Sequence, residues 1–312
     1  MKNDIVSVSF VPHITLDNNK NSDLSQLSQK VFSGLDLSNS TIKDYQYRIG
    51  QFLDFLNRNG FSHKTLLEYK RYLQGLDFSV STKNKYFISA KIFLRELYRL
   101  DYLNKDITVN IKGFKQAHSH KKDGLNDDDI SIIQNHCKTL QPTSENLRLK
   151  AIISLLLFQG LRQIEISRLD IKDIDLKNKC AFIHGKGRDD KELVWLHPFT
   201  VKSLKDYLKN IKIYEGAVFR SNSNFCKNHR LTTKSIRAII KVLLDDLGID
   251  GSTHGFRHFF TTKLIKSYKG ELLTVSKYTR HRSIQMLEVY NDEVIRQEDL
   301  PRFYSVFSEL KF

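Results

Sequence analysis

A chain of 312 residues is long enough for two domains of ordinary size, and 40% hydrophobic residues exclude wholesale disorder. Its 50 Lys and Arg residues outnumber the 35 Asp and Glu residues, which gives a net charge of +15. That excess is unusual for an enzyme of small metabolites and favours a polyanionic partner, either nucleic acid or an anionic membrane surface. The longest apolar run, residues 151–158, is far too short to span a bilayer, so we expect no membrane insertion.

The expected compartment follows from the N-terminus and the cysteines. The first residues, MKNDIVSVSFVPHI, contain an acid and no continuous apolar core, so we expect no secretory signal. The three cysteines, Cys137, Cys180 and Cys226, are isolated and odd in number, as is typical of reduced thiols in a cytoplasm, and they suggest no metal cluster. A soluble, cytoplasmic protein is therefore expected.

The N-terminal third predicts a small helical domain. Residues 1–38 are polar and irregular, and we interpret them as an N-terminal arm that includes one short helix. From Thr41 apolar residues recur at intervals of three and four, and Gly60 follows as a stop signal. Further helices are expected over residues 64–73 and 82–100, so the helical domain covers residues 39–111.

The third of these helices opens with STKNKY, which places Thr82, Lys83 and Lys85 at its N-terminus. Backbone amides and positive side chains at such a place suit a phosphate, and we predict these three as DNA contacts. For any one of them, a capped and solvated helix start is the simpler interpretation.

The segment IKGFKQAHSHKKDG, residues 111–124, carries four lysines, two histidines and no acid before Asp123. We place the domain boundary here, as a basic linker over residues 112–124. As a linker the segment can cross a duplex and neutralise backbone charge, and as a surface loop it only adds solubility. Both interpretations stay open, and the predicted DNA contacts are Lys112, Lys115, Lys121 and Lys122.

The second domain, residues 125–295, is predicted to be mostly helical around a small sheet. Helices are expected from Asn126, over residues 146–159 and over residues 162–169. The period then drops to two in IKDIDL, CAFIH and ELVWL, which predict three strands. Helices return over residues 199–213, 233–247, 253–267, 272–278 and 283–290. The fold class is therefore mainly α with a small antiparallel sheet, an α+β fold.

Two patches of this domain place a cation where a ligand can reach it. In GLRQIEISRL, Arg162 precedes Glu165 by three residues, so the carboxylate can hold a guanidinium fork for two phosphate oxygens. A lone pair of this kind is commonly an ordinary surface ion pair. In HGKGRDD, Lys186 lies between glycines at a turn, where the backbone can approach a ligand closely. Alone, such a lysine is more often a hairpin tip.

The segment HGFRHFF places His254, Arg257 and His258 on one helix face. The two histidines have zinc-ligand spacing, but Gly255 stands where a metalloprotease helix has glutamate, and Arg257 would repel a divalent cation. An anion fits this face better than a metal.

The segment TRHRSIQMLEVY contains His281 and Tyr290, which are nine residues apart and lie on opposite sides of a continuous helix. If both serve one site, the helix must break between them, and Ser283 can cap a new helix. For Tyr290 alone, a packed aromatic is the simpler interpretation.

The order of these four patches over about residues 40–295 resembles the tyrosine recombinase and integrase family. The resemblance implies site-specific cutting and rejoining of DNA through a 3′-phosphotyrosyl bond, without ATP, metal or cofactor. The implied catalytic residues are Arg162, Lys186, His254, Arg257, His281 and the nucleophile Tyr290, with Glu165 and His258 in support.

One departure concerns the residues before His281, where the family usually has Leu-Gly and this chain has Thr279-Arg280. Arg280 and Arg282 flank the histidine and make the turn more basic, so both join the predicted DNA contacts. The departure affects the expected loop conformation and leaves the expected chemistry unchanged.

The resemblance also implies partners: double-stranded DNA carrying a specific site, a protein dimer on that site and a tetramer in synapsis. Accessory proteins stay open, and a nucleoid location is expected when the protein is bound to DNA. The tail, residues 296–312, is predicted as a separate helix capped by Asp299, with an apolar stripe that docks on a neighbouring protomer or on its own core. The stripe consists of Leu300, Phe303, Phe307 and Leu310.

Two other functions use similar residues. A DNA-binding relative that lost catalysis would keep the fold, but the intact catalytic set disfavours it. A topoisomerase or telomere-resolving enzyme would share the chemistry and differ in its product.

Overall fold

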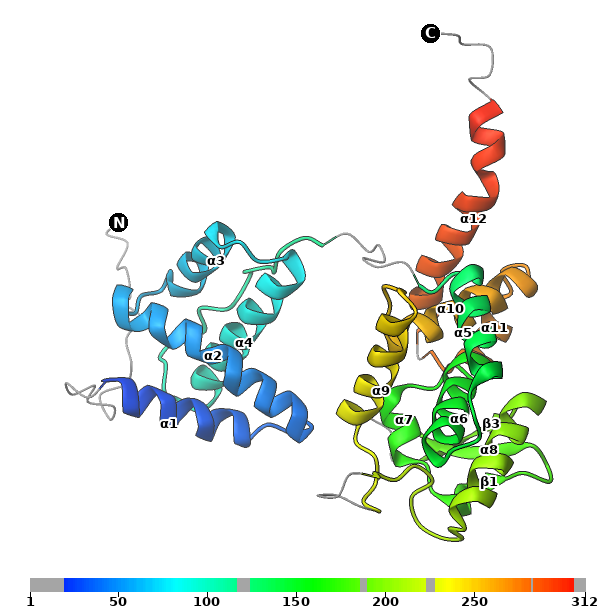
Figure 1. The fold of residues 1–312 in the computed structure, drawn as a ribbon. Helices are drawn as coiled ribbons and strands as arrows, with labels where there is room; N and C mark the ends of the chain where they lie inside the picture. Colours follow the sequence, from blue (N-terminus) through cyan, green and yellow to red (C-terminus); the bar gives the residue numbers. More distant parts are fainter. Residues whose placement is uncertain (1–19, 117–123, 186–189, 223–227, 282, 306–312) are drawn as a thin grey trace, which may run out of the picture. The chain divides into compact units, whose positions relative to one another are not determined.

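The computed structural model describes residues 20–116, 124–185, 190–222, 228–281 and 283–305. They form a mostly helical structure with one three-stranded antiparallel sheet, which confirms the predicted fold class (Figure 1). The chain divides into two compact units between Ala117 and His118, inside the range assigned to the linker. No helix of the described ranges combines the length and apolarity needed to cross a bilayer. Cys137 and Cys180 are free thiols, and Cys226 lies outside the described residues.

The first unit is a bundle of α1 (Lys20–Ser33), α2 (Asn39–Asn59), α3 (Thr65–Gly75) and α4 (Val80–Arg99). Serine caps begin two of these helices, since Ser38 accepts from the third residue of α2 and Ser79 accepts from Thr82 N. The helix expected within residues 1–38 is α1, and its Val31 and Phe32 are buried in the core of the unit. The arm interpretation is therefore wrong for this helix, while residues 1–19 lie outside the described residues.

The start of the predicted linker lies against α4. The Asn84 side chain accepts from Phe114 N (2.8 Å) and donates to Phe114 O (3.0 Å). The ammonium groups of Lys70 and Lys91 donate to the carbonyls of Lys112 and Ile111. Residues 111–114 therefore belong to the first unit, because their backbone groups are paired within it.

The second unit surrounds a helix whose second half is apolar on every side. That helix, α6 (Ser144–Phe158), is buried continuously from Ala151 to Leu157 and packs against α8 and α10 (Figure 1). The other elements are α5 (Asp127–Thr139), α7 (Gln163–Arg168), β1 (Ile174–Asp175), β2 (Cys180–His184), β3 (Lys191–Trp195), α8 (Pro198–Ile211), α9 (Thr233–Asp246), α10 (Thr253–Ser267), α11 (Leu272–Thr279) and α12 (Gln285–Ser305). The strands pair antiparallel in the order β1-β2-β3, with Phe182 opposite Leu193.

Two predicted elements differ from the structure. The first half of IKDIDL is a 3-10 turn over Ile171–Asp173, because the carboxylates of Asp170 and Asp173 cap that turn, and only β1 of this segment joins the sheet. The tail helix expected to begin at Asp299 is a continuation of α12, which runs through Pro301 to Ser305 although proline supplies no N–H to the helix. Phe307, Leu310 and the side chain of Phe303 lie outside the described residues.

Gly160, just after α6, allows a sharp turn that no larger residue fits. Its φ of +56° lies in the left-handed region, and a Cβ there would meet Cδ1 of Phe260 at 2.3 Å. We expect Gly160→Ala to lower the free energy of unfolding by about 1 kcal/mol for backbone strain and roughly 1–3 kcal/mol for overpacking. Gly248→Ala is the matched control, because Gly248 has a φ of +68° and open space where a Cβ would lie. Urea unfolding should show that this variant loses only the free energy due to backbone strain. Equal losses in the two variants would contradict the packing effect.

Candidate active site

A buried carboxylate between two arginines organises one side of the site. Glu165 is 1% exposed and accepts from both the backbone N–H of Arg162 (2.8 Å) and its Nη1 (2.9 Å). The guanidinium of Arg280 donates to the same carboxylate at 3.1 Å. Burial raises the pKa of Glu165, but Arg280 and the hydrogen bonds from Arg162 outweigh burial, so the pKa lies below its ordinary value. The predicted pairing of Arg162 with Glu165 is therefore present, and a third group shares it.

Arg257, on α10, is held by the ends of two other helices. Its side chain is 2% exposed, and it donates to the carbonyls of Gly160 (2.6 Å) and Thr279 (2.5 Å). Burial, followed by the charges of Arg162 and Arg280, lowers the pKa of Arg257 to about 9. The group therefore stays a cation at neutral pH, with its orientation set by backbone atoms.

His281 lies between Arg257 and Thr279. Its Nε2 is 3.3 Å from Nη2 of Arg257, and its Nδ1 is 2.8 Å from the Thr279 hydroxyl. A guanidinium only donates, so Nε2 accepts and the imidazole proton sits on Nδ1, which donates to Thr279. Burial and the nearby arginines lower the pKa of His281 to about 3, so the ring is neutral at pH 7.

Tyr290 lies beside His281 because the chain breaks between α11 and α12, as predicted from the nine-residue spacing. Its side chain is 3% exposed and packs in a small apolar cluster with Ile265 and Leu287. Its ring centroid is 6.1 Å from that of His281 and 4.8 Å from that of His258. The tyrosine is therefore a packed aromatic and a neighbour of the cationic groups at once.

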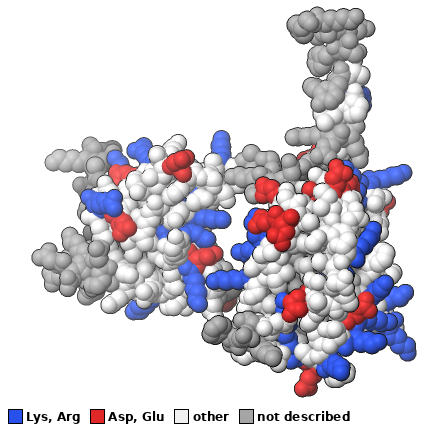
Figure 2. Space-filling model, in the orientation of Figure 1, with Lys and Arg blue, Asp and Glu red and all other residues white. Residues whose placement is uncertain are grey.

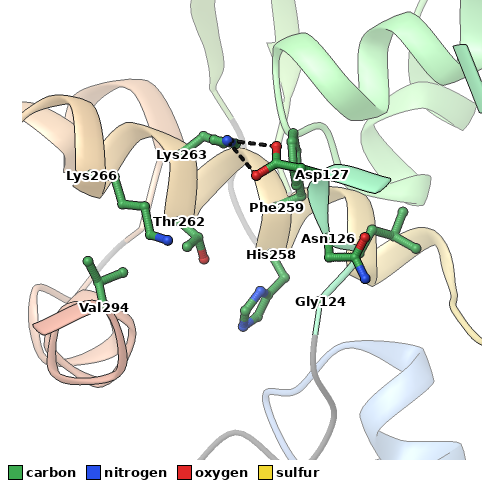
Figure 3. A pocket seen from close by; sticks show the side chains of 10 residues that line it. Gly124, Asn126, Asp127, His258, Phe259, Thr262, Lys263, Lys266 and Val294 are labelled. Carbon is green, nitrogen blue, oxygen red and sulfur yellow. Dashed lines mark hydrogen bonds and ion pairs between the residues drawn. The ribbon is translucent and has the colours of Figure 1, made fainter. Parts of the chain in front are cut away.

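A cavity of about 320 Å³ lies between the start of α5, α10 and α12. Figure 3 shows His258 at this cavity, with Val294 of α12 on one side and Gly124 on the other. A Cβ on Gly124 would meet Nδ1 of His258 at 2.2 Å, so the chain entering α5 passes directly over the histidine. Above it, Lys263 pairs with Asp127 at 2.7 Å. His258 is thus packed between the entry to this unit and the ring of Tyr290.

Residues 124–295 match the model of the phage integrase family. The chain belongs to that family. It is 24% identical over 266 residues to the tyrosine recombinase XerC of Lacticaseibacillus casei, which covers 81% of this chain and 88% of the relative. It is 25% identical over 276 residues to the tyrosine recombinase XerA of Saccharolobus solfataricus, which covers 85% and 86%. The protein is therefore a tyrosine-type site-specific DNA recombinase, as the order of its motifs predicted.

Two solved structures share its fold. XerH recombinase in a post-cleavage complex with palindromic difH substrate aligns with a TM-score of 0.71 and 21% identity, over 89% of this chain and 83% of that one. A lambda integrase dimer bound to a COC′ core site aligns with a TM-score of 0.66 and 12% identity, over 86% and 94%.

The recombinase brings most of the predicted site residues together. One cluster of neighbouring side chains, which we call the catalytic pocket, contains Arg162, Glu165, Arg257, His258, His281 and Tyr290. His254 is exposed at the start of α10, where its charge still contributes to lowering the pKa of His281. Lys186 lies outside the described residues.

The predicted DNA contacts other than Arg280 divide into three groups. Lys85, Lys112 and Lys115 are exposed, while Thr82 and Lys83 are half-buried and Lys83 donates to the carbonyl of Gln74. Lys121, Lys122 and Arg282 lie outside the described residues. Figure 2 shows Lys and Arg side chains on the visible face of both units, among smaller groups of acids.

Arg280 is a correction to the predicted DNA contacts. Its side chain is 4% exposed and faces Glu165, so it does not present its charge at the surface. The sequence pattern reveals neither this pairing nor Thr279 as a partner of His281. The departure from Leu-Gly before His281 is the one signal in this segment, and it is equally compatible with added surface charge.

The lowered pKa of His281 predicts how stability depends on pH. The histidine of the unfolded chain takes up a proton below about pH 6.5, while the folded group resists protonation until about pH 3. His281 therefore contributes its full stabilisation above about pH 6.5. Below that pH the free energy of unfolding falls by up to about 1.4 kcal/mol per pH unit. We expect His281→Asn to reduce the fall in melting temperature between pH 6.5 and 4. His229→Asn, at an exposed histidine of the same unit, should leave it unchanged. Parallel curves for wild type and His281→Asn would contradict the assignment.

Proposed function

We propose that this recombinase cuts and rejoins DNA through a 3′-phosphotyrosyl intermediate with Tyr290 as the nucleophile. The observation that supports it best is the convergence of Arg257, His281 and Tyr290, from α10, the turn after α11 and α12, in one buried pocket. Packing of a hydrophobic core does not require three arginines beside a buried tyrosine. A bound phosphodiester would offset their positive charge.

In this mechanism Arg162 and Arg257 bind the two non-bridging oxygens of the scissile phosphate. Arg257 is oriented by two carbonyls, and Arg162 is oriented by Glu165 while its side chain stays 34% exposed, within reach of DNA. Groups fixed in advance stabilise developing charge without reorganisation, and removing one donor of this kind costs about 10²–10³ in rate. His254 adds a hydrogen bond to the same oxygens, His281 holds Arg257 through its Nε2, and Glu165 and His258 hold the clamp and the tyrosine in place.

The chemical step exchanges one phosphoester for another. The Tyr290 hydroxyl loses its proton to solvent, helped by the neighbouring arginine cations, and its oxygen attacks phosphorus. The bond between phosphorus and the 5′ oxygen breaks, and Lys186 gives that oxygen a proton. Rejoining reverses the step, because a 5′ hydroxyl attacks the phosphotyrosine and the tyrosine leaves. The phosphotyrosyl bond preserves the energy of the phosphodiester, so we propose that no ATP is consumed, and the arginines supply the positive charge, so no metal is required.

Double-stranded DNA with a specific site is the proposed substrate, bound by a dimer and brought into a tetrameric synapse. The net charge of +15 and the exposed Lys85, Lys112 and Lys115 support backbone contacts, to which we add Lys121, Lys122 and Arg282. An exposed apolar face on the sheet supports assembly between copies, since Phe182, Leu193 and Trp195 are 47%, 48% and 63% exposed. We propose this face, together with the predicted tail of residues 296–312, as the contact between protomers.

The first test is the covalent adduct. The bound site is obtained by selection from a random duplex library with the Tyr290→Phe protein, followed by footprinting. On a nicked duplex carrying that site, wild type should form an SDS-resistant adduct in the presence of EDTA, because cleavage traps the tyrosyl phosphate. Tyr290→Phe should bind the duplex equally well and form none.

Wild-type protein that binds the site and forms no adduct would favour a DNA-binding protein without catalysis. Relaxed or hairpin products in place of exchanged strands would favour the topoisomerase or telomere-resolving activity.

The second test concerns Lys186. A general acid is dispensable when the leaving group needs no proton, so we expect Lys186→Ala to slow cleavage of the ordinary duplex by about 10²–10⁴-fold. A duplex with sulfur in place of the scissile 5′ oxygen should restore the rate in this variant. Arg257→Ala is the control and should stay slow on both substrates, because it removes charge stabilisation. Failure of the sulfur substrate to rescue Lys186→Ala would move the general acid elsewhere.

A further inference from the structure

The turn before His281 contains two residues, Thr279 and Arg280, that contact groups of the catalytic pocket. Arg280 ends α11 in the left-handed conformation, with φ 55° and ψ 38°. A long cation is unusual at such a position, where glycine is the common residue. Its side chain is only 4% exposed, so contact with solvent does not explain why an arginine occupies this position. Its role has to come from what the guanidinium contacts.

Arg280 joins three parts of the chain. Its Nη2 donates to Glu165 on α7, and its Nη1 lies 3.3 Å from the carbonyls of both Gln159, after α6, and Tyr278, on α11. Glu165 in turn holds the backbone and the guanidinium of Arg162. Arg280 therefore contacts the group that orients Arg162.

Thr279 contacts the other half of the pocket. Its carbonyl accepts from Arg257, and its hydroxyl accepts from Nδ1 of His281. The residue is fully buried, at 0% exposure. One residue thus sets both the guanidinium and the imidazole that line the proposed phosphate site, and it sets the tautomer of the imidazole as well.

We propose that Thr279 and Arg280 are positioning residues for DNA cleavage. Arg280 acts through Glu165 to hold Arg162, and Thr279 holds His281 in the orientation in which its Nε2 meets Arg257. The inference rests on the proposed function, because positioning has a meaning only if these groups bind the scissile phosphate.

The role of Arg280 has a consequence for pH. The charged groups that face Glu165 are Arg162, Arg257 and Arg280, and the charge of Arg280 is the largest cause that lowers the pKa of this carboxyl. Without Arg280 the pKa of Glu165 rises, so the carboxylate is protonated at a higher pH as the solution is acidified. A neutral Glu165 holds Arg162 less firmly, since charge-assisted hydrogen bonds are the stronger kind. The acid limb of the cleavage profile should therefore move to higher pH.

The test compares Arg280→Gly and Arg280→Lys with wild type in single-turnover cleavage of the nicked duplex, from pH 5 to pH 8. Glycine adopts the same backbone conformation, so Arg280→Gly removes the guanidinium with little strain. We expect a fall of about 10–100-fold in cleavage rate at pH 7, unchanged DNA affinity and an acid limb displaced to higher pH. Arg280→Lys retains the charge and should bring the acid limb back toward that of wild type. If Arg280→Gly does not fold, Arg280→Lys alone should still lose rate, because it cannot reach Glu165 and two carbonyls together.

Lys212→Gly is the matched control. Lys212 is also a left-handed cation that ends a helix, with φ 50° and ψ 39°, but it is exposed at the end of α8. This variant makes the same change of charge and backbone and should keep the wild-type rate and pH profile. Wild-type rate and an unshifted acid limb in Arg280→Gly would overturn the role of Arg280 while leaving the proposed function intact.

Thr279 is tested by a measurement that needs no cleavage. In protein labelled with ¹⁵N-histidine, the hydrogen-bonded Nδ1 proton of His281 should exchange slowly enough to be observed in wild type and in Thr279→Ser. It should be lost in Thr279→Val, which keeps the shape and removes the hydroxyl, and cleavage should fall by about 10-fold in that variant alone. A wild-type rate in Thr279→Val overturns the positioning role, even if the proton is lost. An unchanged proton signal with no adduct from wild-type protein would instead place the failure in the proposed function.

Discussion

The site depends on one buried negative charge among three guanidinium groups. Arg162, Arg257 and Arg280 each influence the pKa of a neighbour in the pocket, so their mutual repulsion is appreciable. Glu165 is the carboxylate that accepts from two of them, and it is itself almost wholly buried. A buried charge is tolerable only when it is paired and hydrogen-bonded, so the carboxylate and the arginines stabilise one another. The positive charge left over is what an incoming phosphate would offset.

Backbone carbonyls at the ends of two helices also stabilise the buried arginines. The last carbonyls of a helix have no partner within the helix and carry its negative partial charge. Beyond α6, the carbonyls of Gln159 and Gly160 accept from Arg280 and Arg257. At the end of α11, Tyr278 and Thr279 provide carbonyls to the same two arginines. The two buried arginines thus cap both helices and tie them together. The left-handed backbone at Gly160 and Arg280 allows these carbonyls to turn toward the pocket.

Residue spacing was enough to predict most of this arrangement. The helix predicted over residues 253–267 has the observed limits of α10, and the distance from His281 to Tyr290 predicted a break before α12. Residue spacing did not predict the structure of IKDIDL, where capping by Asp170 and Asp173 competes with strand pairing. It also did not predict the tail, where α12 continues through Pro301. Both errors arise where a local interaction opposes the pattern by a small margin.

By itself the sequence determined the family, the helical fold class and the identity of the residues that meet in the pocket, because these depend on residue type and order along the chain. Only the tertiary structure decided which groups Arg280 and Thr279 contact. A charged side chain after a helix is normally solvated, and nothing in a linear pattern reveals that a carboxylate more than a hundred positions earlier lies beside it in the interior. Burial reverses the meaning of the charge, from a surface contact with DNA to a partner of Glu165, and burial is a property of the folded chain.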